Sequence, residues 1–307
     1  MSSVQQVAAH ALPAAVGRRP QPPPRWHPHL HRSDFVWSIA FVLPYAAAFF
    51  LFFVYPFAVA LWMASDPALY RELFSDPIYL STLINTLLFV GLGVNLTMFL
   101  ALLLSGFFLR RGWWIKALLA LFVLPWTVAA AQAAVSFHWL LIYRWGWVDG
   151  ILSALFGIDG PDWFGDRWLA LATNIAAYIW KWLPFWTLIF LAGRMTIPRN
   201  IYDAAEVDGA TGLRRFVHVT FPLLANLYLI CTLLSTLWAL GDFTTVYLVS
   251  AGGPALSTEV LATLGFHYAF ELGNPALGVA AAMSALPVLI PIAIILMRRL
   301  QTSEVQL

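Results

Sequence analysis

Long stretches without a charged side chain constrain the fold of this chain more than any other sequence feature. A helix needs about 20 apolar residues to cross the hydrocarbon core of a bilayer. Six stretches of 26 to 33 residues exceed this length, and only one of them contains a charged residue, Lys181. They lie between Asp34 and Asp66, Asp76 and Arg110, Lys116 and Arg144, Arg167 and Arg194, Arg215 and Asp242, and Glu271 and Arg298. The sequence therefore predicts an all-α polytopic membrane protein with six transmembrane helices. Their predicted centres are Phe50, Val94, Val128, Ile179, Leu229 and Pro287.

The overall composition supports this prediction and excludes other classes. The 307 residues are 61% hydrophobic and 10% charged, whereas soluble domains carry about 25% charged residues. A formal net charge of +2 is too small to suggest a nucleic-acid partner. The single cysteine, Cys231, excludes an internal disulfide and a multi-cysteine metal site, and its apolar surroundings favour a buried hydrophobic role.

Residues 1–33 are rich in proline, arginine and histidine and lack the apolar core of a signal peptide. We expect them to form a disordered cytoplasmic tail. Alternating histidines occur there at His27, His29 and His31, but no functional metal site is predicted. The transmembrane domain is predicted for residues 34–300 and a short cytoplasmic tail for residues 301–307.

The distribution of basic residues predicts the orientation in the membrane, because cytoplasmic loops carry an excess of Lys and Arg. With the N-terminus inside, 13 of the 17 basic residues face the cytoplasm, three lie outside and Lys181 lies within a span. Both termini are therefore predicted to be cytoplasmic. The cytoplasmic set is Arg18, Arg19, Arg25, Arg32, Arg110, Arg111, Lys116, Arg194, Arg199, Arg214, Arg215, Arg298 and Arg299.

Two outer segments are longer than simple turns. Residues 143–168 contain four tryptophans, which suit the membrane interface, and residues 148–157 are predicted to form a short interfacial helix. Residues 241–274 carry the sequence Gly-Gly-Pro. We expect a turn there, followed by a helix that lies at the outer surface or dips partly into the membrane.

The cytoplasmic loop of residues 194–222 is long and rich in charge. Residues 200–208 favour a short helix with Asn200 as its cap. Gly209 permits a sharp turn, and Thr211 is expected to cap a second short helix that ends before the fifth span. The predicted result is a compact helix-turn-helix knob that projects into the cytoplasm.

The order of residues in this loop is more informative than its composition. It runs Asp203, Ala204, Ala205, Glu206, Val207, Asp208, Gly209 and Ala210, and continues to Phe216, Val219 and Pro222. This order resembles the EAA signature of the permeases of binding-protein-dependent ABC importers. It is most similar to the carbohydrate (maltose-type) branch, whose pattern is EAA-x-x-DGA. Three other segments also resemble that branch, namely Asn85-Thr86, Ile197-Pro198 and Gly252-Gly253-Pro254.

The resemblance extends from about residue 35 to residue 299 and implies the type I ABC importer permease fold. Two residues depart from the family pattern. Asp203 stands where the family has Glu, which keeps the charge with a shorter reach, and Phe221 stands where the family has Leu.

The resemblance also implies partners and a mechanism. The short helix of residues 202–208 would seat in a groove of a cytoplasmic ABC ATPase, so the implied coupling residues are Tyr202, Asp203, Ala204, Ala205, Glu206, Asp208, Gly209 and Ala210. This chain has no GxxxxGK[ST] phosphate loop, so it is expected to hold no cofactor and no catalytic site. ATP and Mg²⁺ would bind to two separate ATPase subunits.

The other implied partners are a second permease that forms a heterodimer with this chain, membrane lipid, and a periplasmic or lipid-anchored solute-binding protein. The implied location is the bacterial inner (plasma) membrane.

Ionisable and polar residues at membrane depth are candidates for the substrate pathway. Lys181 either positions neighbouring helices or lines the pathway, with Trp182 beside it as a surface for a sugar ring. Asp242 is a candidate partner for Lys181 or an ordinary interfacial charge. Asn95 and Gln132 are weaker candidates, because such residues usually join helices.

Three other functions remain as alternatives. The first is a permease of the same fold for a polyol phosphate, a sulfonated sugar, a polyamine or an amino acid. The second, an ion-coupled secondary transporter, is disfavoured because the span interiors hold no carboxylate and no repeat is evident. The third, an intramembrane aspartyl enzyme, is disfavoured because it needs a second intramembrane aspartate.

Overall fold

The computed structural model describes residues 32–304, and this part of the chain forms helices and connecting turns without a β-strand. Its internal contacts divide it into two units, one ending at Phe57 and one beginning at Ala58. The described part of the first unit consists of α1 (Arg32–Phe49), the π-helical turn η1 (Phe50–Val54) and the start of α2 (Tyr55–Met63). Most of the expected N-terminal tail, including the three histidines, lies outside the described residues.

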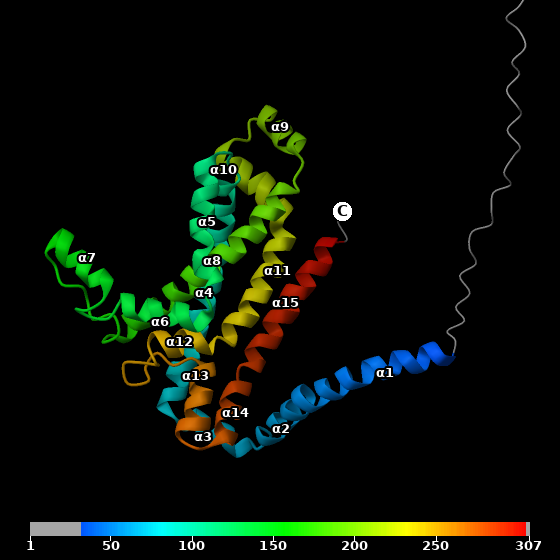
Figure 1. Ribbon diagram of the computed structural model, residues 1–307, viewed down its shortest axis with the longest axis vertical. Helices are drawn as coiled ribbons and strands as arrows, with labels where there is room; N and C mark the ends of the chain where they lie inside the picture. The colour runs from blue at the N-terminus through cyan, green and yellow to red at the C-terminus, as the bar shows by residue number, and fades with distance from the viewer. Residues whose placement is uncertain (1–31, 305–307) are drawn as a thin grey trace, which may run out of the picture. The chain divides into compact units, whose positions relative to one another are not determined.

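The second unit contains all the remaining elements (Figure 1). These are α3 (Pro67–Ser75), α4 (Pro77–Phe108), α5 (Trp113–Thr127), α6 (Ala130–Leu140), α7 (Trp147–Phe156), α8 (Arg167–Met195), α9 (Arg199–Val207), α10 (Gly212–Arg215), η2 (Phe216–Thr220), α11 (Phe221–Leu240), α12 (Phe243–Val249), α13 (Leu261–Phe266), η3 (His267–Glu271), α14 (Pro275–Met283) and α15 (Leu286–Glu304).

Four helical segments in the described residues are long and apolar enough to cross a membrane. They are Val36–Met63, Pro77–Phe108, Arg167–Met195 and Gly212–Leu240. They coincide with the first, second, fourth and fifth predicted spans. The last of them begins in the cytoplasmic loop, because α10, η2 and α11 form one continuous helix.

The third predicted span is not one straight helix. It is divided into α5 and α6, which meet at an angle of 102° close to the predicted centre, Val128. The sixth, centred on Pro287, falls on α15, and a break after Met283 separates α15 from α14. By length and apolar composition the described chain has four spans, or five if the bent pair counts as one. The count of six is therefore not confirmed in full.

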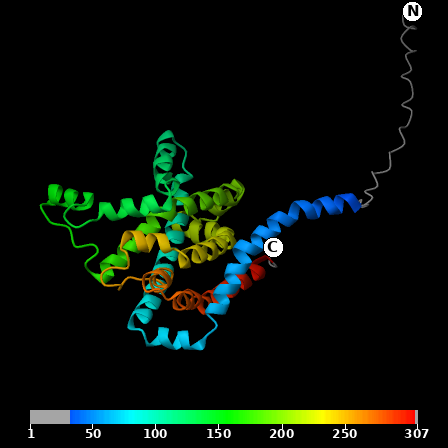
Figure 2. The same cartoon turned by 60° about the horizontal axis from the view of Figure 1, so that its bottom comes forward.

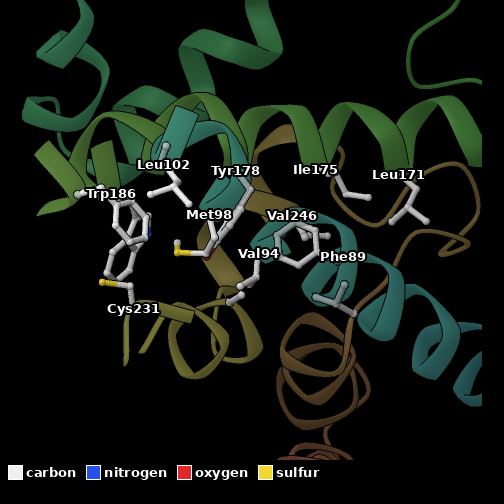
Figure 3. Close-up of a cluster of buried hydrophobic side chains, with 14 of the residues drawn as sticks. Phe89, Val94, Met98, Leu102, Leu171, Ile175, Tyr178, Trp186, Cys231 and Val246 are labelled. Atoms are coloured by element: carbon white, nitrogen blue, oxygen red, sulfur yellow. The ribbon is translucent and has the colours of Figure 1, made fainter. Parts of the chain in front are cut away.

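The core of the second unit lies where α4, α8, α11 and α12 pack together. Figure 3 shows side chains from these helices in contact, with Met98 and Tyr178 near the centre of the view. The rings of Phe89 and Tyr178 meet edge to face with centroids 5.3 Å apart. The Tyr178 hydroxyl lies 3.0 Å from Oγ of Ser235, so its one polar atom is satisfied inside an apolar cluster.

A second cluster joins α3 and α4 to α13, η3 and α14 at the end of the unit opposite α9 (Figure 1). The Tyr268 hydroxyl donates a 2.5 Å hydrogen bond to Asp76 there. The turn and helix expected after the Gly-Gly-Pro sequence are present, but Leu261 and Leu264 are buried against neighbouring helices. This segment is therefore part of the packed core at that end.

The helix expected at residues 148–157 corresponds to α7. In both views α7 extends away from the packed pair α4 and α8 (Figures 1 and 2). The neighbouring Trp145 and Trp147 are 89% and 72% exposed. Large exposed indole rings at a helix end are typical of residues that lie at a membrane interface.

Candidate functional site

The loop with the EAA-like sequence folds as a short helix, a sharp turn and a second helix. α9 buries Ala205 and half-buries Tyr202, while Asp203, Glu206 and Asp208 are exposed. One face of α9 therefore packs on the protein, and the other presents three carboxylates to solvent. We call residues 199–215 the coupling knob.

The turn of the coupling knob closes in a Schellman motif. The amide of Ala210 donates to the carbonyl of Ala205 at 2.8 Å, and the amide of Gly209 donates to that of Glu206 at 3.0 Å. Gly209 has a φ of +74°, a left-handed conformation in which glycine avoids the steric cost of a Cβ atom. The sharp turn predicted at Gly209 is therefore present, and its backbone geometry explains the residue type.

Two details of the predicted capping are wrong. Pro198 occupies the N-cap position of α9, so Asn200 lies inside the helix and caps nothing. Thr211 does occupy the N-cap position of α10, but its side chain makes no capping hydrogen bond. The second helix also does not stop near Thr220, because its backbone continues through η2 into α11.

Contacts between two helical arms, α9 and the segment formed by α10 and η2, hold the coupling knob together. The guanidinium of Arg215 lies 5.8 Å from the centre of the Tyr202 ring, and Thr220 donates to the Tyr202 hydroxyl at 3.4 Å. Arg215 also forms an ion pair with Glu206 at 3.9 Å, in which both side chains are exposed. Such an exposed pair contributes little stability, so the aromatic ring of Tyr202 is the main contact between the arms.

Two large apolar side chains on the coupling knob are almost fully exposed. Val207 is 88% exposed and Leu213 is 75% exposed, and they lie on either side of the Gly209 turn. Exposed apolar side chains surrounded by charges are typical of a surface that binds another protein.

A cavity of about 520 Å³ lies between α6, α8, α11 and α12. The predicted pathway residues Lys181, Trp182 and Asp242 all line it. Its other walls combine aromatic rings with small residues. They are Ala130, Ala133, Ala134, Phe137, Ala177, Trp180, Leu237, Trp238, Gly241, Thr244 and Thr245.

Lys181 holds the bend between α5 and α6. Its ammonium group donates to the carbonyls of Pro125 at 2.8 Å and Trp126 at 3.2 Å, and also to that of Val128. The last carbonyls of a helix have no partner within the helix and carry partial negative charge. The interpretation that Lys181 positions helices therefore has direct geometric support, while its place in the cavity wall keeps the pathway interpretation open.

Asp242 is hydrogen-bonded to Thr245 and not to Lys181. Its carboxylate accepts hydrogen bonds from the amide of Thr245 at 2.9 Å and from the Thr245 hydroxyl at 2.7 Å. It is therefore the N-cap of α12, and the described residues contain no ion pair between Asp242 and Lys181.

The structure does not bring Asn95 or Gln132 to the cavity. Asn95 is exposed on α4 and donates to the carbonyl of Gly91, one turn earlier, at 2.7 Å. Gln132 is also exposed, on a face of α6 that does not line the cavity. Other polar residues of α4, among them Asn85 and Thr97, are buried, and the sequence did not show that Asn95 is an exception.

Asn85 is a buried polar residue that was not predicted as a site residue, although it belongs to one of the segments that resemble the carbohydrate branch. Its amide nitrogen donates to the carbonyls of Ser257 at 2.8 Å and Glu259 at 3.0 Å. Its amide oxygen accepts a hydrogen bond of 3.1 Å from Arg167. Asn85 thereby fixes the Gly-Gly-Pro loop to α4 and α8. Its polarity at membrane depth was the sequence signal for this role.

Comparisons with known proteins identify the family. A profile described as "Binding-protein-dependent transport system inner membrane component" matches residues 33–303. The chain belongs to this family. Its members are inner-membrane permeases, so the predicted multi-pass inner-membrane location and the recognised type of permease are confirmed.

Two curated permeases illustrate the similarity. This permease is 34% identical over 256 residues to the sulfoquinovosyl glycerol transport system permease protein SmoG of Agrobacterium fabrum, covering 78% of this chain and 82% of that protein. It is also 34% identical over 194 residues to the trehalose/maltose transport system permease protein MalF of Thermococcus litoralis. The second match covers 63% of this chain and 64% of that protein.

A solved structure supports the all-α permease fold. The similar chain belongs to the crystal structure of a bacterial alginate ABC transporter in complex with an alginate pentasaccharide-bound periplasmic protein. The TM-score is 0.75 at 21% identity, and the match covers 86% of this permease and 93% of that chain. The predicted fold class is thus confirmed, apart from the number of spans and the cytoplasmic location of both termini.

Proposed function

We propose that this permease forms half of the translocation pathway of an ATP-driven importer for a sugar or a sugar derivative. Membership of the family supports the importer assignment, and the systems named for two of its relatives transport sugar-containing solutes. The cavity supports the solute class, because Trp182 and Trp238 lie in its wall. Flat aromatic faces suit the apolar CH groups of a sugar ring.

The coupling knob is the proposed contact with the ATPase. Two cytoplasmic ABC ATPase subunits would bind ATP and Mg²⁺, and one of them would receive α9 in a surface groove. The exposed Val207 and Leu213 would be buried in that contact, while Asp203 and Glu206 would pair with basic groups. A second permease would complete the pathway, and a periplasmic or lipid-anchored binding protein would deliver the solute.

One observation carries this proposal furthest, namely the continuity of the helix from Gly212 to Leu240. It begins in the coupling knob, and Leu237 and Trp238 near its other end line the cavity. At 1.5 Å per residue its 29 residues span about 43 Å. A displacement of the knob by the ATPase would therefore reach the cavity through a single rigid element.

Charge reversal in the coupling knob tests the proposed coupling. In the assembled transporter, Asp203→Lys combined with Glu206→Lys is expected to abolish solute-stimulated ATP hydrolysis and transport, while the permease still inserts. Gly209→Asp is expected to act in the same direction, because it strains the turn that shapes the knob. Glu72→Lys combined with Asp159→Lys makes the same charge change on exposed outer residues and serves as the control.

Transport at the normal rate in both knob variants would refute the coupling role. Equal loss in the knob and outer-surface variants would show a general charge effect, and it would refute the role as well.

The solute is best identified through the cognate binding protein. Its thermal stability would be measured against neutral, phosphorylated and sulfonated sugars, a polyamine and an amino acid. Stabilisation by a sugar ligand is expected, and the ammonium of Lys181 in the cavity wall favours an acidic derivative. Stabilisation by the polyamine or the amino acid alone would replace the sugar proposal with the alternative solute class.

A further inference from the structure

A second pocket, of about 670 Å³, lies between the coupling knob and the ends of α4 and α8 nearest to it. Four arginines contribute to its lining, and we call it the basic pocket. Its complete lining is Gly106, Phe108, Leu109, Arg111, Leu191, Arg194, Met195, Ile197, Arg199, Tyr202, Arg215 and Thr220. The cavity lined by Lys181, Trp182 and Asp242 shares none of these residues.

Arg194 forms the rigid base of the basic pocket. It is buried, and it donates to Oγ of Ser105 at 2.7 Å and to the carbonyl of Leu102 at 2.9 Å. Its guanidinium lies against α4 at Gly106, where a Cβ atom would be only 3.4 Å from Cζ. Neutral partners orient this cation without neutralising it, so its charge remains available to an anion.

The other arginines are also poorly neutralised. Within residues 32–304, only Arg215 of the four forms an ion pair, and that pair with Glu206 is long and exposed. Arg111 and Arg199 are exposed at the edge of the basic pocket. Several guanidinium groups with few carboxylates favour a ligand with phosphate-like oxygens, because Arg binds such groups through charge-assisted hydrogen bonds.

The other lining residues indicate whether the phosphate-like group belongs to a free ion or to a lipid. Most of it is apolar, and two of these residues, Leu109 and Met195, are 43% and 71% exposed. Contacts with an apolar surface do not stabilise a bound phosphate ion. A phospholipid places its headgroup beside its acyl chains, so it matches both parts of the lining.

We propose that the basic pocket binds the headgroup of an anionic phospholipid from the cytoplasmic leaflet. Basic pockets between transmembrane helices on the cytoplasmic side are suited to such headgroups. The distribution of Lys and Arg places this end of the permease on that side. The bound lipid would connect α4 and α8 to the coupling knob. This inference does not depend on the identity of the solute.

Neighbouring arginine pairs in the sequence provide a matched test. Arg111 and Arg215 line the basic pocket, whereas Arg110 and Arg214 precede them and do not. The full chain, purified into detergent, would be titrated with dioleoyl phosphatidylglycerol or dioleoyl phosphatidylcholine, and retained lipid would be counted by native mass spectrometry. The same titrations would be made with the variants and with inorganic phosphate as a competitor.

The wild type and Arg110→Gln/Arg214→Gln are expected to retain phosphatidylglycerol selectively. Arg111→Gln/Arg215→Gln is expected to bind it roughly thirtyfold more weakly, since each basic residue near an anionic lipid contributes about fivefold. Arg111→Lys/Arg215→Lys, which keeps the charge, is expected to recover most of the binding, and this separates a lost contact from misfolding.

Four results would overturn the proposal. Equal loss of phosphatidylglycerol binding in the two Gln variants would indicate only a diffuse positive surface. Unchanged phosphatidylglycerol binding in Arg111→Gln/Arg215→Gln would exclude the basic pocket as the lipid site. Displacement of the lipid by millimolar phosphate would show that a free anion suffices. Loss of the lipid when the ATPase assembles with the permease would show that the ATPase covers the pocket.

Discussion

Four aspartates illustrate how single residues shape this permease. Asp66, Asp76, Asp166 and Asp242 are the N-caps of α3, α4, α8 and α12, and each accepts a hydrogen bond from a backbone amide. The start of a helix presents unpaired amides and the positive end of the helix dipole, and aspartate satisfies both. These four aspartates therefore define where their helices begin.

Lys181 is the residue whose replacement separates positioning from solute contact. Lys181→Met leaves three carbonyls at the α5–α6 bend without their donor, and we expect a loss of about 1–3 kcal/mol in stability. Thermal unfolding of the purified permease would measure it. Lys116→Met is the control, because Lys116 is the only other lysine and is exposed.

Transport by the Lys181→Met variant completes this test. A lower transport rate with unchanged thermal stability would contradict the positioning role and favour direct contact with solute. Unchanged transport with unchanged assembly would remove Lys181 from the pathway.

At the scale of elements, small residues decide how closely α13 and α14 pack. A Cβ atom on Gly278 of α14 would lie 2.5 Å from the carbonyl oxygen of Gly265 on α13. Ala280 and Ala281, in the same helix, are completely buried. Close backbone approach through small residues is how membrane helices gain contact when lipid is as apolar as the side chains.

Gly278→Ala is therefore expected to destabilise the permease by about 1–3 kcal/mol, because α13 and α14 must move apart. Gly91→Ala is the matched control, since Gly91 lies in the helix α4 and a Cβ atom there meets nothing within 4 Å. The midpoint of thermal unfolding in detergent would compare the two. Equal midpoints for the two variants would contradict the proposed close packing.

At the scale of the whole molecule, the permease is expected to expose α7 and the coupling knob on opposite sides of the membrane. Single cysteines would be introduced as Ser153→Cys in α7 and Asn200→Cys in α9, both exposed positions. Cys231→Ala would remove the native thiol, which is buried. A membrane-impermeant maleimide would then report the side on which each position lies.

Labelling in right-side-out vesicles is expected only for the Ser153→Cys variant, and labelling in inside-out vesicles only for the Asn200→Cys variant. Labelling of both from the same side would refute the orientation deduced from the basic residues.

Several features of this protein were determined by the sequence alone. Long uncharged runs predicted a membrane protein, and four of the six predicted spans coincide with helices that can cross a bilayer. The coupling knob was predicted with its turn at Gly209, because glycine position and motif spacing are local properties. The bend at Val128 was missed, and Lys181, which donates to the carbonyls there, lies more than 50 residues away in the sequence.

Only the tertiary structure decided which polar residues meet. Lys181, Trp182 and Asp242 line one cavity, whereas Asn95 and Gln132 are exposed elsewhere. The physical reason is that lipid and protein interior are almost equally apolar, so the few polar residues of a transmembrane helix mark its inner face only in part. Asn85 of α4 is buried, whereas Asn95 of the same helix is exposed. Sequence therefore determines where such a helix begins and ends, and packing against its neighbours determines which way it faces.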